Sequence, residues 1–298
     1  MRILAIALMI LLPASVLSAQ EARTTEGSRL ENLVPDLPPE LRLEQIRKYI
    51  RDNGLEWEAG LTSKALLPVE AKRRILGNLI VPGDGAPTIQ IVPGSVPDEL
   101  DWRDFGGVSA VTPVKDQGSC GSCWAFAAAG TAESSFKFIY GTELDLSEQH
   151  LVSNGRICCT NCGDCQGGWS DSCFTFMING GILDEAAMPY TGISDECRYS
   201  RDWEEHVIYP IESYFKIEPD FPEVYMHALF EYGPLAVGIF ADDLFLFYSE
   251  GVYSNPAPTG ELNHVVVLVG WDEEGWIIKN SWGTDWGEAG YGHIAFGS

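Results

Sequence analysis

Long hydrophobic runs, basic residues and histidines are scarce in this sequence, and these shortages exclude several classes of function. The apolar run at residues 3–12 is too short for a bilayer, which needs about 20 apolar residues, and no other stretch is apolar enough, so we expect no membrane span. Residues 96–298 carry 8 basic and 32 acidic side chains, which accounts for the whole net charge of −24. This field repels phosphate backbones, so we expect no nucleic-acid partner. No Asn-x-Ser/Thr glycosylation triplet occurs.

The first 95 residues divide into a leader and a separate element. Arg2 before the apolar run and Ser18-Ala19 after it are typical of a cleaved secretory signal, predicted at residues 1–19. The expected location is the secretory pathway, in a lysosome-like or vacuolar compartment or outside the cell. Residues 20–95 predict helices around 41–49 and 69–76 and an extended patch at 55–61, followed by a Pro/Gly-rich hinge at 81–94.

Residues 96–298 predict an α+β fold with two lobes. The first part, about 96–207, is helical and holds all eight cysteines. The second part, about 208–298, is rich in β-branched and aromatic runs. These predicted strands are Ala236–Phe240, Gly251–Tyr253, His264–Gly270, Trp276–Lys279 and Tyr291–Phe296.

Cys123 is the candidate nucleophile. Small or apolar side chains recur at helical spacing over 123–140, and Gly141 supplies a C-terminal stop. Cys123 therefore opens a predicted helix, where unpaired N–H groups and the helix dipole favour the reactive thiolate. The Gln117 side-chain amide and the Cys123 backbone N–H form a candidate pair of oxyanion donors.

His264 is the best of five histidines for the role of base. It opens the apolar strand 265–269, which would fix its ring, although a histidine taken alone is more often structural. Asn280 follows another short strand, so its side-chain oxygen is a candidate acceptor that orients the ring. Trp282 is expected to shield that hydrogen bond from water. The other histidines lie in polar or helical contexts.

The cysteines allow two interpretations. An even set in a secreted chain is typical of disulfides. Cysteines 158, 159, 162 and 165 are also spaced like a zinc knot, and a zinc-stabilised module is the alternative. The oxidising compartment favours disulfides, so we expect no metal and no cofactor.

Taken together, the motifs resemble the papain-like cysteine proteases (clan CA, family C1). The resemblance rests on Gln117-Gly118-x-Cys120-Gly121-Ser122-Cys123-Trp124-Ala125-Phe126, on Asn263-His264 and on Asn280-Ser281-Trp282-Gly283. His264 and Asn280 lie 141 and 157 residues after Cys123, near the spacing of that family. The resemblance implies a two-lobe fold with a cleft, a zymogen inhibited by its own propeptide at 20–95, peptide or protein substrates and a monomer.

The resemblance also implies roles for further residues. Gly167 and Gly168 would form a cleft edge whose exposed backbone pairs with an extended substrate. The specificity pocket would be lined by Trp169, Gly238 and Leu262, with Asn263 beside the catalytic histidine. Cys120 would pair with Cys165, Cys158 with Cys197 and Cys159 with Cys162, leaving Cys173 as a buried free thiol.

Within the family, the double cysteine 158–159 and Trp57-x-Ala59-Gly60 are similar to cathepsin B. The insertion with two histidines that caps the cathepsin B cleft is missing between Pro189 and Cys197, so we predict endopeptidase and no carboxydipeptidase activity. The chain ends at Ser298, before a further strand that closes the specificity pocket in the family. The alternative function is therefore a catalytically impaired peptide-binding protein, against which the complete catalytic set argues.

Overall fold

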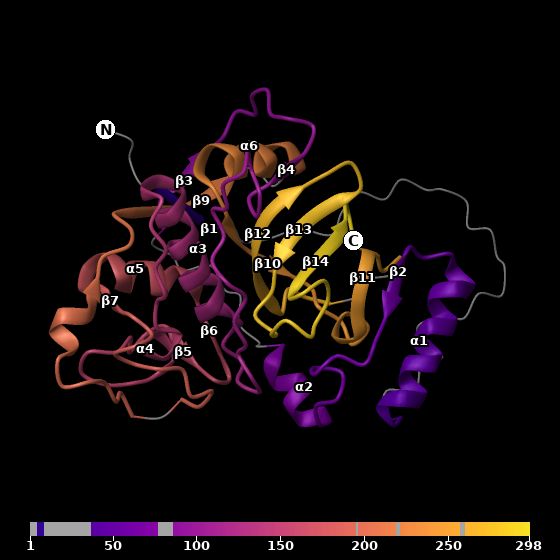
Figure 1. The fold of residues 1–298 in the computed structure, drawn as a ribbon, viewed down its shortest axis with the longest axis horizontal. Coiled ribbons are helices and arrows are strands. Elements are labelled where there is room, and N and C mark those ends of the chain that lie inside the picture. The colour runs from indigo at the N-terminus through magenta and orange to yellow at the C-terminus, as the bar shows by residue number, and fades with distance from the viewer. Residues whose placement is uncertain (1–4, 9–36, 77–85, 195, 219–220, 257–259) are drawn as a thin grey trace.

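The computed structural model describes residues 5–8, 37–76, 86–194, 196–218, 221–256 and 260–298. The chain forms a helical lobe, a sheet lobe and an N-terminal segment, residues 37–76, that lies along the side and foot of the sheet lobe (Figure 1). Within these described ranges, no helix has the length and apolar character needed to cross a membrane.

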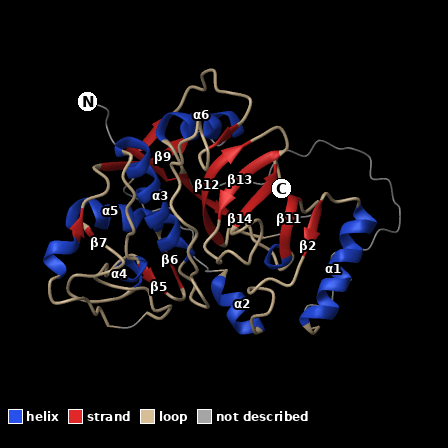
Figure 2. Ribbon diagram, viewed as in Figure 1, coloured by secondary structure: helices blue, strands red, loops and turns tan. Residues whose placement is uncertain are grey.

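Helices and strands are segregated, as Figure 2 shows. The helices are α1 (Pro39–Asn53), α2 (Val69–Ile75), α3 (Cys123–Tyr140), α4 (Glu148–Val152), α5 (Ser170–Gly180), α6 (Pro222–Tyr232) and the 3₁₀ turns η2 (Trp203–His206) and η3 (Phe245–Phe247). The strands are β1 (Ala5–Leu8), β2 (Trp57–Ala59), β3 (Thr88–Gln90), β4 (Leu100–Asp101), β5 (Gly163–Asp164), β6 (Gly167–Gly168), β7 (Ile182–Leu183), β8 (Val207–Ile208), β9 (Ser213–Glu218), β10 (Leu235–Ile239), β11 (Tyr248–Tyr253), β12 (His264–Trp271), β13 (Gly275–Lys279) and β14 (Tyr291–Ala295).

The central helix α3 confirms the predicted span. Its first thirteen residues are buried, because alanine, glycine and hydroxyl side chains let it pack closely against β12 of the other lobe. It ends at Gly141, whose left-handed backbone (φ 66°) places its N–H on the Lys137 carbonyl at 2.8 Å. The helix thus carries Cys123 at the junction of the two lobes.

One mixed sheet dominates the second lobe, in the order β2-β11-β14-β13-β12-β10-β1-β9-β3, with β4 also paired to β12. Strands β10, β12, β13 and β14 are antiparallel neighbours, and all eight residues of β12 are buried. The register sets Ile239 opposite His264 and Lys279 opposite both Val267 and Tyr291. Two residues of the predicted site, His264 and Asn280, therefore lie at corresponding ends of adjacent strands.

The N-terminal segment contacts the sheet lobe at several points. Strand β2 pairs antiparallel with β11, and Arg42 of α1 forms an ion pair of 2.8 Å with Asp243. Thr62 donates a buried hydrogen bond of 2.5 Å to the Leu246 carbonyl. Helix α2 then reaches the foot of the seam between the lobes (Figure 1).

Some strands differ from the sequence-based expectation. Residues 5–8, inside the predicted signal, form β1 between β10 and β9; the rest of residues 1–19 lies outside the described ranges. Strands β3 and β9 pair in parallel within segments for which no strand was predicted. Their partners are distant in sequence, so local composition gave no signal.

Candidate active site

Cys123 is the first residue of α3 and is 1% exposed. It takes no part in a disulfide. Its position at the helix start leaves the backbone N–H groups of the first turn without helical partners. The thiol therefore lies where backbone donors and the positive end of the helix dipole stabilise negative charge.

His264 and Asn280 meet in a buried hydrogen bond. The Nε2 atom of His264 lies 2.8 Å from Oδ1 of Asn280, which also accepts from the Ser281 backbone N–H at 2.8 Å. Because an amide oxygen can only accept, this contact assigns the proton of the histidine to Nε2. Within the described residues, Nδ1 has no hydrogen-bond partner and is left as a proton acceptor.

Burial controls the charge of this histidine. Desolvation lowers the pKa of His264 to about 4, while the hydrogen bond to Asn280 acts in the opposite direction. The Trp282 ring lies 4.6 Å from the His264 ring, between centroids, and is itself fully buried. In this structure the His264 imidazole is therefore neutral at neutral pH and separated from water.

The Gln117 side chain is held by three contacts. Its Oε1 accepts from the Ser281 hydroxyl at 2.7 Å, and its Nε2 donates to the Cys120 carbonyl at 2.8 Å. The second Nε2 hydrogen points to the carbonyl of Ile75 at 3.2 Å. The Ile75 carbonyl of the N-terminal segment therefore accepts a hydrogen bond from Gln117 Nε2, the predicted oxyanion donor.

The cleft-edge glycines lie differently from the expectation. Gly167 and Gly168 form β6 and pair with β5 in a small hairpin, and both residues are buried. Gly168 is buried because the Trp124 ring and the Cys162 carbonyl pack against its α-carbon. Both glycines are therefore buried in this structure, and their pairing with an extended substrate stays a prediction.

The predicted pocket residues come from both lobes. Trp169 precedes α5, whereas Gly238 in β10 lies opposite Val265, next to His264. Leu262 is half-buried. The Asn263 side chain bonds to the backbone of Ala241, accepting at 2.8 Å and donating at 2.9 Å, so it anchors the loop before His264.

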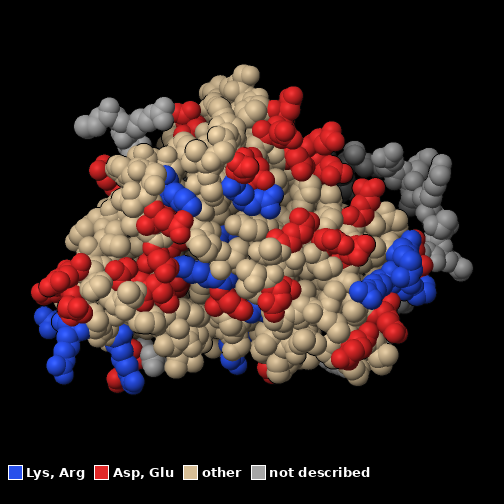
Figure 3. Space-filling model, in the orientation of Figure 1, with Lys and Arg blue, Asp and Glu red and all other residues tan. Residues whose placement is uncertain are grey.

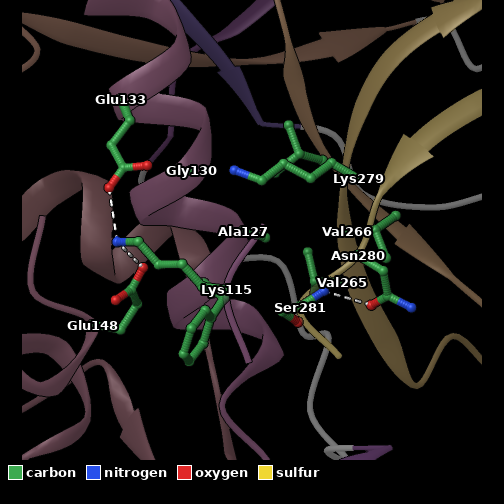
Figure 4. A pocket seen from close by; sticks show the side chains of 12 residues that line it. Lys115, Ala127, Gly130, Glu133, Glu148, Val265, Val266, Lys279, Asn280 and Ser281 are labelled. Atoms are coloured by element: carbon green, nitrogen blue, oxygen red, sulfur yellow. Dashed lines mark hydrogen bonds and ion pairs between the residues drawn. The ribbon is translucent and has the colours of Figure 1, made fainter. Parts of the chain in front are cut away.

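A buried charge cluster closes the seam behind the site. Lys115 contacts Glu133 at 3.0 Å and Glu148 at 2.9 Å, around a cavity of about 20 Å³ that Lys279 enters from β13 (Figure 4). Burial raises the pKa of Glu148 to about 8, although Lys115 opposes the shift. Burial lowers the pKa of Lys279 to about 8. Lys279 is the last residue of β13 and directly precedes Asn280. The cluster therefore supports the strand end next to Asn280, whose Oδ1 accepts from His264.

Six cysteines form disulfides, which join Cys120 to Cys165, Cys158 to Cys197 and Cys159 to Cys162. These sulfurs are therefore not thiolate ligands for zinc in this structure. Cys173 is a buried thiol on α5, and desolvation raises its pKa well above the ordinary value. It differs from Cys123 in position, because Cys123 is the first residue of its helix and Cys173 is the fourth residue of α5.

Sequence reasoning missed the groups that orient and cover the site. The Ser281 hydroxyl fixes the Gln117 amide, and the Tyr190 hydroxyl donates to the Gln117 carbonyl at 3.0 Å. Ser281 lies inside the Asn-Ser-Trp-Gly motif and was detectable there. Ile75 had no local signal, because its contact joins positions 42 residues apart.

The amino-acid sequence is similar to those of known thiol proteases. A sequence model of the papain family of cysteine proteases matches residues 96–298. Cathepsin L of Sarcophaga peregrina is 42% identical over 208 residues, covering 66% of this chain. Digestive cysteine proteinase 2 of Homarus americanus is 36% identical over 267 residues, covering 83% of this chain and 80% of that protein. The chain spans 58% of the length of the Sarcophaga protein.

Solved structures agree over a longer stretch that includes the N-terminal segment. Digestive procathepsin L2 proteinase from the larval midgut of Tenebrio molitor superposes with a TM-score of 0.75 at 33% identity, covering 87% of this chain and 85% of that one. Procathepsin L 3 of the same tissue gives a TM-score of 0.73 at 28% identity, covering 86% of this chain and 83% of that one.

Proposed function

The chain belongs to the papain family of cysteine proteases, and from this membership we propose that it is an endopeptidase made as an inactive precursor. The hydrogen bond of 2.8 Å between His264 and Asn280 carries the proposal, because it leaves Nδ1 free to take a proton from Cys123. The N-terminal segment is the inhibitory part of the precursor. Its Ile75 carbonyl lies on Gln117, where a substrate carbonyl would bind.

The reaction follows from these positions. His264 Nδ1 takes the Cys123 proton, and the sulfur attacks the carbonyl carbon of the peptide bond. Gln117 Nε2 and the Cys123 N–H bind the oxyanion. The carbon–nitrogen bond breaks as His264 gives its proton to the leaving amine, and a thioester remains. Water, deprotonated by His264, then hydrolyses the thioester and restores the thiol.

The subtype is better described as cathepsin L-like. The expectation of a cathepsin B subtype rested on the double cysteine 158–159, but the relatives reported above are a cathepsin L, a digestive proteinase and procathepsins L. Endopeptidase action does not depend on the subtype assignment, because no histidine lies between Pro189 and Cys197 to bind a substrate C-terminus. For the location we infer the secretory pathway, from the pattern of residues 2–19.

The test is covalent labelling of full-length protein matured at mildly acidic pH. We expect a thiol-directed epoxide to label Cys123 stoichiometrically, Cys123→Ala to take up no label, and Cys173→Ala to be labelled like the wild type. The precursor should resist labelling, because Cys123 is 1% exposed in it. Label on Cys173 alone would contradict the assignment. A matured protein that binds peptides without an acyl-enzyme burst would instead support the impaired binding protein.

A further inference from the structure

Lys64, between β2 and α2, places its ammonium group in a pocket of the catalytic domain. Its side chain is 3% exposed, and its Nζ lies 2.5 Å from Asp116 Oδ1 and 3.4 Å from the Gly118 carbonyl. A buried ammonium requires such partners, because desolvation without them is expensive. The catalytic domain therefore contains a cation pocket made of one carboxylate and one carbonyl.

The pocket adjoins the predicted catalytic groups. Asp116 directly precedes Gln117 and forms an antiparallel bridge with Trp282. The Trp282 ring packs on His264, the group that protonates the leaving amine in the proposed reaction. The pocket therefore lies on the leaving-group side of the scissile bond.

The pocket is formed by residues 96–298 alone, and Lys64 only occupies it. The Gly118 N–H donates to Asp116 Oδ1 at 2.8 Å, which holds the carboxylate in place. Gly283 leaves room beside it, since a Cβ there would lie 2.9 Å from Asp116 Oδ2. The Asp116 side chain is 46% exposed even with Lys64 bound, so the pocket opens to solvent.

The neighbouring lysine does not neutralise this carboxylate. The Lys115 ammonium points into the seam, where it contacts Glu133, Glu148 and Asp145 at 2.8 to 3.0 Å. Among the described residues, Lys64 is the cation with which Asp116 forms an ion pair. Departure of the N-terminal segment would leave a negative pocket beside the scissile bond.

We propose that Asp116 and the Gly118 carbonyl form a subsite for a lysine or arginine side chain one or two residues after the scissile bond, and that Lys64 fills it in the precursor. This inference rests on the proposed peptidase function. Because the carboxylate is half exposed, the preference is moderate, on the order of five-fold for lysine over glutamine, and it weakens as salt rises.

The test uses matured enzyme and quenched peptides that differ at one leaving-group position, with Lys, Arg, Gln or Glu there. We expect kcat/KM to fall in the order Lys and Arg, then Gln, then Glu. In Asp116→Asn the Lys-to-Gln ratio should approach one, since asparagine keeps the acceptor for Gly118 N–H but lacks the charge. Asp164→Asn is the matched control, because Asp164 makes the same kind of turn, to Gln166 N–H, in the β5–β6 hairpin; its ratio should stay at the wild-type value.

The outcomes separate the two claims. Failure to cleave any peptide or to label Cys123 contradicts the proposed function itself. Cleavage with equal Lys and Gln rates, or a lysine preference that survives in Asp116→Asn, overturns the subsite alone. A basic preference only before the scissile bond also overturns it, because the pocket then lies on the wrong side.

Discussion

Asn280 acts at the scale of a single side chain, by fixing which nitrogen of His264 holds the proton. Its Oδ1 faces two donors, so the oxygen and not the amide nitrogen points to the ring. The amide Nδ2 is buried and has no hydrogen-bond partner among the described residues. An unpaired buried amide is unfavourable for folding, which indicates that the side chain is kept for its effect on the histidine.

Asn280→Ala should lower kcat/KM on the order of 10²-fold, since the ring loses the acceptor that orients it for proton transfer. The measurement is peptide hydrolysis together with the pH dependence of Cys123 alkylation, which should change because the His264 pKa changes. Asn263→Ala, one residue before the histidine, is the control for general loop damage. Equal activity of Asn280→Ala and wild type would refute the orienting role.

The residues that the sequence identified share one property: they lie in short contiguous motifs. Cys123, Gln117 and Asn280 each stand in such a motif, although the Ser281 hydroxyl that fixes the Gln117 amide lies 164 positions away. Lys64 and Ile75 were missed because their partners lie 52 and 42 residues away, and only the packing of the N-terminal segment brings them to the site.

At the scale of elements, β2 is the strand that joins the N-terminal segment to the sheet. Trp57 is 2% exposed, donates from Nε1 to the Ser254 carbonyl at 3.2 Å and packs on Tyr253, with ring centroids 4.9 Å apart. Glu58 points outward from the same strand. Trp57 and Ala59 point inward, so this buried face makes the apolar contact of the strand.

Trp57→Ala should loosen the N-terminal segment, because removal of a buried tryptophan costs about 3–5 kcal/mol. If that loss falls on the bound segment, the precursor should convert to the mature enzyme faster, by about 10²-fold or more. The measurement is the rate of conversion at mildly acidic pH, with Glu58→Ala as the matched control on the exposed face. Conversion of Trp57→Ala at the wild-type rate would show that β2 does not hold the segment.

The predicted elements were those with a strong local pattern. Helix α3 agrees with the prediction at both ends, because its small residues and Gly141 are local signals. Strands β10, β12, β13 and β14 were all expected, from apolar, β-branched and aromatic runs in the local sequence. Strands β1, β3 and β9 were missed, because parallel pairing depends on distant partners and not on the local sequence.

At the scale of the whole molecule, charge and buried histidines determine the response to acid. Acidic side chains spread over the visible face, and basic side chains form several smaller patches on it, one of them over α1, which contains Arg47, Lys48 and Arg51 (Figure 3). Inside the helical lobe, His150 accepts from Leu183 N–H on Nδ1 at 3.1 Å and lies 2.8 Å from the Ile157 carbonyl on Nε2. Protonation of Nδ1 would remove the acceptor for Leu183.

Burial lowers the pKa of His150 to about 4, below its ordinary value of 6.5. The unfolded chain therefore binds a proton that the folded chain does not between these values, so stability falls as pH drops from 6.5 to 4. The full effect of this one group is roughly 3 kcal/mol. The raised pKa of Glu148 has the opposite effect on stability as the pH drops, but this effect is the same in the wild type and in a variant at His150.

His150→Gln in the Cys123→Ala background should therefore lose less stability than its parent between pH 6.5 and 4. The measurement is urea unfolding at several pH values. His206→Gln is the control, because Asp184 raises the pKa of this half-buried histidine and its contribution changes only above pH 6.5. Identical pH slopes for His150→Gln and its parent would exclude His150 as a source of acid sensitivity.

The pairing of β2 with β11 has a consequence for the processed protein. Strand β2 is the outermost strand, so its removal would make β11 an open sheet edge, the kind of surface on which copies of a protein aggregate. The register shift between Tyr248 and Glu250 and the left-handed Gly251 (φ 87°) interrupt the regular ladder there. The irregularity that accommodates the N-terminal segment would then also keep matured molecules from joining strand to strand.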